Sequence, residues 1–183
     1  PRRPVGFAMR GEPSGNTELP ALPPLVLDAD ALNLLAARDG WWERLPAETV
    51  VTPHPGEMSR LTGLPIEEIS QDRLGIARRY ASRWHVTVLL KGAFTVIAAP
   101  EGRATIVPFA NPLLASAGSG DVLAGAVVGL LAQGLTAYEA ALCGAYLHGL
   151  AGSLRRRQIG AAGLLAGDLL PLLPVALRKV RGF

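Results

Sequence analysis

The chain has 183 residues, 49% of them hydrophobic and 18% charged, which fits one globular domain and excludes an intrinsically disordered chain. A net charge of +3 with 5% aromatic residues gives neither a strongly basic surface nor an aromatic platform for nucleic acid, and the single cysteine excludes an internal disulfide. The longest apolar run, residues 122–132, is too short to span a membrane. We therefore expect a cytoplasmic protein without nucleic-acid or membrane partners.

Short apolar runs predict the strands. Residues 1–24 come first; they are rich in proline, glycine and arginine without a hydrophobic period, which predicts an irregular N-terminal segment. Strands are expected at residues 25–27, 50–52 and 86–90, followed by a hairpin of residues 95–99 and 104–107.

Helical spacing separates these strands and dominates the last third of the chain. Helices are expected to begin at Ala31 and Glu57, and to cover residues 70–84 and 137–154. The residues expected to cap helices are Asp30, Ser70, Thr136, as part of a capping box with Glu139, and Asp168. Strands that alternate with helices predict a layered α/β domain with a parallel sheet.

Polar residues follow three of the expected strands. Segments 28–30, 52–57 and 91–95 each begin where a strand ends. Ligands of parallel α/β sheets bind beyond the carboxyl ends of the strands. The three segments are therefore expected to point their polar residues into one crevice.

The segment Ser116-Ala117-Gly118-Ser119-Gly120-Asp121 has the composition of an anion-binding loop. Its glycines let backbone N–H groups turn toward one point, and the helix expected directly after it adds unpaired N–H donors and a partial positive charge. Such a loop suits a phosphate or a developing oxyanion. Asp121 is either the N-cap of that helix or a base that acts on an incoming hydroxyl, because a carboxylate otherwise repels a phosphate.

Read with its flanks as Asn111 to Gly125, this loop resembles the signature of the ADP/ATP-dependent NAD(P)H-hydrate dehydratases, which belong to the ribokinase-like superfamily. Three more segments resemble the family in order and spacing: Leu27-Asp28-Ala29-Asp30-Ala31-Leu32-Asn33, Thr52-Pro53-His54-Pro55-Gly56-Glu57 and Leu90-Lys91-Gly92-Ala93-Phe94-Thr95. The resemblance implies a ribokinase-like three-layer α/β/α fold with a mostly parallel central sheet that lacks the family's first strands. Residues 25–183 would then form the C-terminal part of such a domain, after the irregular segment 1–24.

The same resemblance implies a function in nicotinamide nucleotide repair. The family transfers a terminal phosphoryl group from ADP or ATP, with Mg²⁺, to the ring hydroxyl of hydrated NADH or NADPH; phosphate then leaves and NAD(P)H is restored. By resemblance, Asp121 is the base and contacts the hydrate together with His54. The nucleotide would be bound by Lys91, Gly92, Ala93, Phe94, Thr95 and Gly120, and the anion hole would be formed by Gly118, Ser119 and Gly120. No protein ligand to a metal is expected, although Glu57 is a candidate to hold a magnesium-bound water.

Two other functions compete with this interpretation. The first is a vitamin or sugar kinase of the same superfamily, of the hydroxymethylpyrimidine or hydroxyethylthiazole type; His54 favours the dehydratase, because those kinases tend to carry Asn here. The second is a non-catalytic remnant that binds nucleotide, which the short N-terminus favours. A homo-oligomer is also expected, with Gly125 and Gly129 packing helices closely either within or between chains, as is an NAD(P)H-hydrate epimerase domain or partner.

Overall fold

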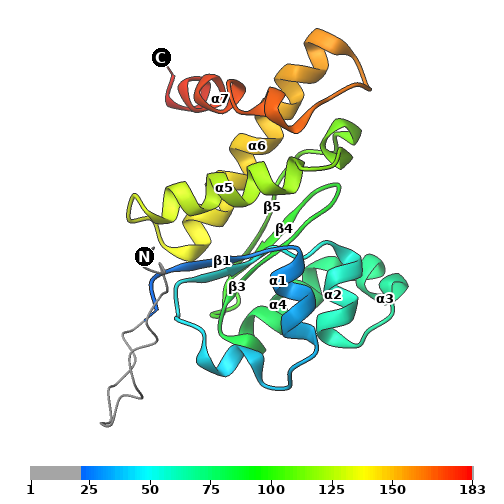
Figure 1. The fold of residues 1–183 in the computed structure, drawn as a ribbon, viewed down its shortest axis with the longest axis vertical. Helices are drawn as coiled ribbons and strands as arrows, with labels where there is room; N and C mark the ends of the chain where they lie inside the picture. Colours follow the sequence, from blue (N-terminus) through cyan, green and yellow to red (C-terminus); the bar gives the residue numbers. More distant parts are fainter. Residues whose placement is uncertain (1–21, 183) are drawn as a thin grey trace, which may run out of the picture.

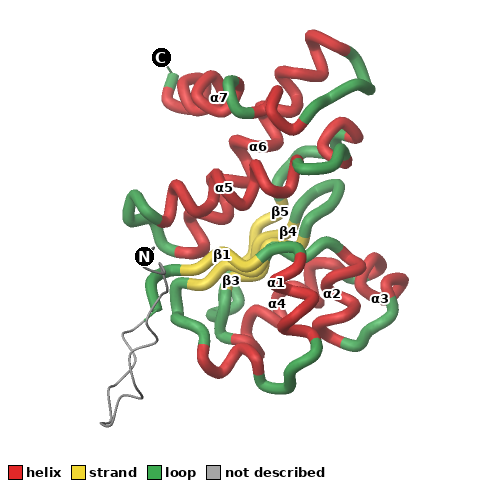
Figure 2. Tube along the Cα trace, viewed as in Figure 1, coloured by secondary structure: helices red, strands yellow, loops and turns green. Residues whose placement is uncertain are grey.

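The computed structural model describes residues 22–182, so most of the expected irregular segment lies outside the described residues. A sheet of five strands lies between two layers of helices (Figures 1 and 2). The strands are β1 (Leu25–Leu27), β2 (Thr49–Val51), β3 (Thr87–Leu90), β4 (Val96–Ala98) and β5 (Ala104–Ile106). The α-helices are α1 (Asp30–Ala36), α2 (Pro55–Thr62), α3 (Ile66–Gln71), α4 (Arg73–Trp84), α5 (Ser119–Leu131), α6 (Ala137–Ile159) and α7 (Leu172–Arg181). The short 3₁₀ helices are η1 (Trp41–Arg44), η2 (Pro112–Ala115) and η3 (Ala166–Leu169).

The sheet follows the chain, with the strand order β1-β2-β3-β4-β5. β1 pairs with β2 and β2 with β3 in parallel, whereas β3 with β4 and β4 with β5 pair in antiparallel fashion. The expected hairpin is confirmed. The sheet is nevertheless mixed rather than mostly parallel, because the connections after β3 and β4 are too short for the crossover that a parallel pair requires.

Each face of the sheet packs against its own layer of helices. Successive residues of a strand point to opposite faces. Val51 accordingly belongs to the core under α1, α2 and α4, together with Met58 and Trp84, while Val50 belongs to the core under α5 and α6, together with Val127. Every residue of β2, β3 and β4 is buried, as expected for strands covered on both faces. The expected three-layer arrangement is confirmed.

Glycines let α6 lie close to its neighbours. A methyl group added at Gly149 would lie 2.2 Å from Cδ2 of Phe109, and one at Gly144 would lie 2.7 Å from Cγ2 of Val127. Helix α6 therefore touches both α5 and the segment after β5 through positions where any side chain would collide. Gly125 and Gly129 differ, because an added methyl would meet nothing within 4 Å. The interpretation that these two glycines pack helices within the chain is wrong for the described residues.

Two expected caps are wrong at the start of helices. Asp30 is the first residue of α1. The N-cap of this helix is Ala29, which makes no side-chain capping bond. The single helix expected over 70–84 is two helices, because Asp72 breaks it: the Asp72 Oδ1 accepts a hydrogen bond of 2.8 Å from the Gly75 N–H and caps α4. Ser70 instead lies near the end of α3.

The C-terminal helices confirm one capping prediction and contradict another. Thr136 and Glu139 form the expected capping box at the start of α6, which extends to Ile159. Asp168 lies in η3 and does not cap α7; its carboxylate accepts hydrogen bonds from the Leu165 N–H and from Arg155, each at 3.1 Å.

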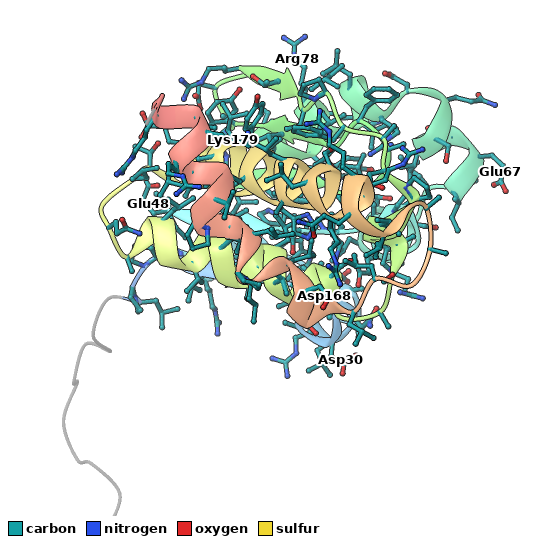
Figure 3. All side chains as sticks on the ribbon, turned by 90° about the horizontal axis from the view of Figure 1, so that it is seen from above. Asp30, Glu48, Glu67, Arg78, Asp168 and Lys179 are labelled. Atoms are coloured by element: carbon teal, nitrogen blue, oxygen red, sulfur yellow. The ribbon has the colours of Figure 1, made fainter. Side chains whose placement is uncertain are left out.

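The outer surface of the layers carries charge. Seen from above, the labelled residues Glu67 and Arg78 lie at the periphery of the molecule (Figure 3). No helix within residues 22–182 combines the length and the apolar character needed to cross a membrane.

Candidate active site

A buried ion cluster joins the carboxyl ends of β1, β2 and β3. Lys91 Nζ lies 2.6 Å from Oδ1 of Asp28 and 3.5 Å from Oε2 of Glu57. The three side chains are only 19%, 13% and 6% exposed, respectively. The convergence expected of three strand ends is therefore confirmed for these residues. Asp30 is not part of the cluster, because it is exposed on α1.

His54 caps helix α2 with its side chain. Nδ1 accepts hydrogen bonds from the N–H groups of Gly56 at 3.0 Å and Glu57 at 3.3 Å, while Oε2 of Glu57 accepts one of 2.7 Å from the His54 N–H. This is a capping box in which histidine replaces serine or threonine. An accepting Nδ1 leaves the proton of the neutral ring on Nε2, on a side chain that is 50% exposed. Asn is also a good N-cap, so the capping role alone is common to both residue types.

The anion-binding loop leads directly into α5. Gly118 is the N-cap in a left-handed conformation, with φ 80°, and makes no side-chain capping bond. Asp121 lies in the first turn of α5, and its side chain is exposed. The interpretation of Asp121 as the N-cap is therefore wrong. Within residues 22–182, its carboxylate forms no hydrogen bond or ion pair, so it is available to a ligand.

Ser119 is fixed inside the protein rather than aimed at a ligand. Its hydroxyl donates to the Leu114 carbonyl at 2.6 Å, and its N–H donates to the Ser116 carbonyl at 3.2 Å. Among the described residues, the N–H groups of Gly120 and Asp121 have no protein acceptor, as is usual in the first turn of a helix. If the loop binds an anion, these two groups are the free donors.

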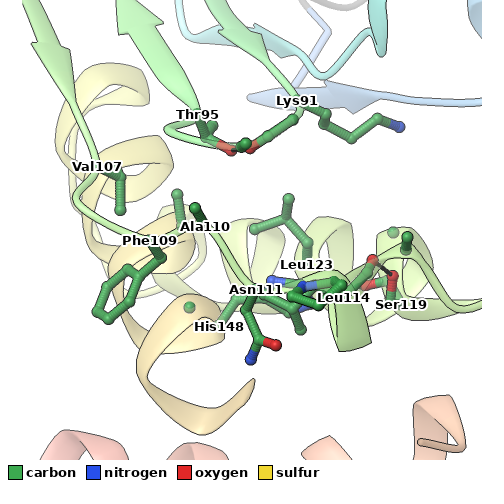
Figure 4. A pocket seen from close by; sticks show the side chains of 17 residues that line it. Lys91, Thr95, Val107, Phe109, Ala110, Asn111, Leu114, Ser119, Leu123 and His148 are labelled. Carbon is green, nitrogen blue, oxygen red and sulfur yellow. Dashed lines mark hydrogen bonds between the residues drawn. The ribbon is translucent and has the colours of Figure 1, made fainter. Parts of the chain in front are cut away.

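A pocket of about 460 Å³ lies between the β3–β4 connection and the starts of α5 and η2 (Figure 4). Six expected site residues line it: Lys91, Gly92, Ala93, Thr95 and Gly120 of the expected nucleotide-binding set, and Ser119 of the expected anion hole. The sequence did not identify the mostly apolar remainder: Val107, Phe109, Ala110, Asn111, Pro112, Leu114, Ala115, Leu123, Ala145, His148 and Gly149. An apolar cavity beside phosphate-binding groups suits the base and ribose of a nucleotide.

Four of the expected site residues do not line this pocket. Phe94 is 53% exposed and adopts a left-handed φ of 55°, with its N–H donating to the Phe109 carbonyl at 2.8 Å. Asp121, His54 and Gly118 lie outside the pocket as well. A methyl group added at Gly120 would lie 3.7 Å from Oδ2 of Asp28 and 3.8 Å from Nζ of Lys91. Gly120 therefore connects the pocket with the ion cluster.

His148 supports the loop from α6. It is buried, and its Nε2 lies 3.0 Å from the Ser119 carbonyl oxygen. Burial lowers the pKa of His148 to about 4, against the opposing effect of the hydrogen bond to Ser119. The ring is therefore neutral near pH 7, and Nε2 donates to Ser119. The only sequence signal for this residue is its place among apolar residues of a helix, which is also typical of a core histidine.

Residues 22–182 contain no group of three or more His, Cys, Asp or Glu side chains that is able to hold a metal ion. The carboxylates of Asp28 and Glu57 face the ammonium group of Lys91, which occupies the position a bound cation would take. Magnesium in nucleotide sites is often bound mainly by phosphates and water with one or two carboxylates. The residues present fit that arrangement and not a metal cage built by the protein.

The family model described as NAD(P)H-hydrate dehydratase matches residues 14–174. A bifunctional NAD(P)H-hydrate repair enzyme of Moorella thermoacetica is 52% identical over 157 residues, which are 86% of this chain and 30% of that protein. An ADP/ATP-dependent NAD(P)H-hydrate dehydratase of Bacillus subtilis, co-crystallised with ATP and Mg²⁺ and soaked with CoA, superposes with a TM-score of 0.76 at 36% identity, over 85% of this chain and 56% of that one. A ribokinase-like superfamily protein of Enterococcus faecalis gives 0.69 at 30% identity, over 84% and 52%. The expected fold is confirmed, and the chain spans about half of the solved chains and 30% of the Moorella protein.

Proposed function

Because the chain belongs to the NAD(P)H-hydrate dehydratase family, we propose that it forms the nucleotide-binding and catalytic part of a dehydratase that restores NADH and NADPH from their hydrates. The terminal phosphoryl group of ADP or ATP passes to the ring hydroxyl, and AMP or ADP leaves. Phosphate is then eliminated with loss of a ring proton, which regenerates the dihydropyridine. Residues 25–183 correspond in this proposal to the C-terminal part of the domain.

The observation that carries the proposal is the position of Asp121. Its exposed carboxylate lies on the first turn of α5, next to the free N–H of Gly120. Gly120 in turn lies beside the Lys91 ammonium and at the wall of the apolar pocket. A base, anion donors, a cation and a cavity thus meet at one place, which is what phosphoryl transfer to a hydroxyl requires.

Each residue then has a role that its surroundings support. Asp121 accepts the proton of the attacking hydroxyl. In the anion hole proposed at Gly118, Ser119 and Gly120, the free N–H of Gly120, together with that of Asp121, stabilises the charge of the transferred group, while the bound Ser119 holds the loop in place. Lys91 and the pocket residues Gly92, Ala93 and Thr95 bind the nucleotide, with Phe94 covering it from outside. His54 contacts the hydrate through Nε2–H.

Magnesium neutralises nucleotide phosphate charge when it is bound. In our proposal it arrives with ADP or ATP, and Glu57, a buried carboxylate that contacts Lys91, would hold a magnesium-bound water. The Bacillus subtilis relative was crystallised with ATP and Mg²⁺, which supports this choice.

The proposal includes two partners. A homo-oligomer is supported by a stripe of α5 that residues 22–182 leave uncovered: a methyl group added at Gly125 or Gly129 would meet none of their atoms within 4 Å, and Val128 is 48% exposed. An NAD(P)H-hydrate epimerase, as a fused domain or a separate protein, would supply the reactive epimer. The bifunctional name of the Moorella relative is consistent with fusion.

One assay tests the function directly. The chain is incubated with hydrated NADH and either ADP or ATP, and the absorbance of the reduced nicotinamide ring is followed, with nucleotide binding measured in parallel by calorimetry. Recovery of the absorbance with either nucleotide is the expected result. Binding without recovery contradicts the dehydratase and favours a non-catalytic nucleotide-binding protein, whereas the absence of both contradicts any nucleotide-dependent function.

A further inference from the structure

Arg73, the first residue of α4, reaches the connection between β3 and β4. Its Nη1 donates to the Ala93 carbonyl at 2.7 Å, and its Nη2 donates to the carbonyls of Leu90 at 2.9 Å and Lys91 at 3.1 Å. One guanidinium group therefore binds three carbonyls within residues 90–93. Lys91, Gly92 and Ala93 of this segment line the 460 Å³ pocket.

The guanidinium of Arg73 has no carboxylate partner among residues 22–182. Its Nε is buried without an acceptor, and burial lowers the pKa of the group. A partly buried cation is unfavourable unless hydrogen bonds compensate for the lost water. Here the compensation comes from the three backbone carbonyls alone. The carbonyls therefore fix the position of the Arg73 guanidinium, and the guanidinium in turn fixes the backbone conformation of residues 90–93.

Gly92 shows how closely the two are fitted. Its φ of 146° disfavours any other residue, and a methyl group added there would lie 2.7 Å from Nη1 of Arg73. On the other side, Arg73 is fixed by the start of α4, which Asp72 caps through the Gly75 N–H at 2.8 Å. The segment is thus held against a helix end rather than left as a free loop.

The orientation of the peptide groups has a consequence for binding. The C=O and N–H of a trans peptide point in opposite directions. When the Lys91 carbonyl faces Arg73, the N–H of Gly92 faces away from it. The neighbouring N–H groups of Lys91 and Phe94 donate to the carbonyls of Pro53 and Phe109, but the N–H of Gly92 has no acceptor in the described part of the chain. That donor is left for a ligand.

We propose that Arg73 is a positioning residue for the nucleotide. It holds residues 90–93 so that the Gly92 N–H and the Lys91 ammonium are presented to the phosphates, without touching them itself. This inference rests on the proposed function for the identity of the ligand. The fork of the guanidinium is essential, because its two terminal nitrogens reach carbonyls on either side of Gly92, whereas an ammonium group presents all its donors from one atom.

The test compares Arg73→Met and Arg73→Lys with a matched control, Arg78→Met, which removes an exposed arginine of the same helix. Calorimetry gives the Kd for ADP, and turnover of hydrated NADH gives kcat and both KM values. For Arg73→Met we expect Kd and KM for ADP to rise about 10- to 100-fold, the factor for one lost hydrogen bond to a charged group. The KM for the hydrate and the kcat at saturating ADP should change far less.

Arg73→Lys decides between geometry and charge. Affinity close to that of Arg73→Met supports the positioning role, and affinity equal to wild type overturns it, because charge alone would then suffice. An unchanged Kd in Arg73→Met also overturns it. Thermal unfolding of each variant shows whether it folds; if Arg73→Met does not, the comparison of Arg73→Lys with wild type stands, since lysine keeps the charge.

The outcomes also separate this inference from the proposed function. Wild-type chain that binds ADP without restoring NADH contradicts the dehydratase, while the Kd comparison still tests Arg73. Wild-type chain that restores NADH, with variants that bind ADP normally, overturns the role of Arg73 alone. Wild-type chain that does not bind ADP overturns both.

Discussion

The substitution His148→Gln should make the folded chain less sensitive to acid. His148 is buried against the carbonyl of Ser119, and its pKa is lowered from 6.5 to about 4, first by desolvation and against the hydrogen bond to Ser119. The unfolded chain therefore takes up this proton at a higher pH than the folded chain. Stability that is fully present above pH 6.5 is lost as the pH falls toward 4.

The structure sets the size of the effect. One pKa unit corresponds to about 1.4 kcal/mol, so the difference between 6.5 and about 4 corresponds to about 3 kcal/mol of unfolding free energy. Glutamine does not titrate, and its amide N–H can donate to Ser119 in place of Nε2. Between about pH 7 and about pH 4, the variant should therefore lose about 3 kcal/mol less stability than wild type.

Urea unfolding of both proteins across this pH range measures the difference. Other titrating groups are common to both proteins and cancel in the comparison. The matched control is His85→Asn, which removes an exposed histidine, and asparagine tolerates the left-handed φ of 54° found there. If wild type and His148→Gln lose the same stability on acidification, the argument that burial keeps this ring neutral is refuted.

Three further predictions concern the proposed site. Asp121→Asn should lower turnover about 10²- to 10⁴-fold with little change in the Kd for ADP, whereas Glu67→Gln, at the exposed first turn of α3, should change neither; an unchanged rate would remove Asp121 from the role of base. His54→Asn should keep the unfolding free energy within about 0.5 kcal/mol, because asparagine also caps helices, while the KM for the hydrate rises; equal KM values would leave His54 as a cap only. Phe94→Gly should change the unfolding free energy by no more than about 1 kcal/mol, since glycine adopts positive φ freely. It should raise the Kd for ADP about 2- to 10-fold; an unchanged Kd would show that Phe94 does not cover the nucleotide.

Local patterns in the sequence were enough to predict the strands and the loop. The run Leu25–Leu27 and the hairpin were predicted because apolar runs this short, bounded by turn residues, are too short for a helix and favour strands. The capping box at Thr136 was found because its chemistry is confined to four residues. Asp30 and Ser70 failed for the opposite reason: a polar residue near a helix start is common, and which one caps depends on where the backbone enters the helix.

The candidate site was predicted in part. The predicted part is the one whose residues lie in short motifs at the ends of strands. Asp28, Glu57 and Lys91 met as expected, because parallel strands bring their carboxyl ends to one edge. The apolar wall with Phe109 and the supports from Arg73 and His148 were missed. These residues act through tertiary contacts of helices, and nothing in their local sequence distinguishes an arginine or histidine that holds a loop from one at the surface or in a core.

The strand order of the sheet also bears on how the chain is made. In the sheet of residues 22–182, each strand pairs only with its neighbours in sequence. Each strand from β2 to β5 can therefore pair, as soon as it is synthesised, with the strand made just before it. Assembly of the sheet can therefore keep pace with translation, without an early segment waiting exposed for a late one. Helices α5 and α6, which carry Asp121 and His148, follow all five strands in the chain and can pack on a sheet that has already formed. The face that carries the candidate site is therefore built after the sheet.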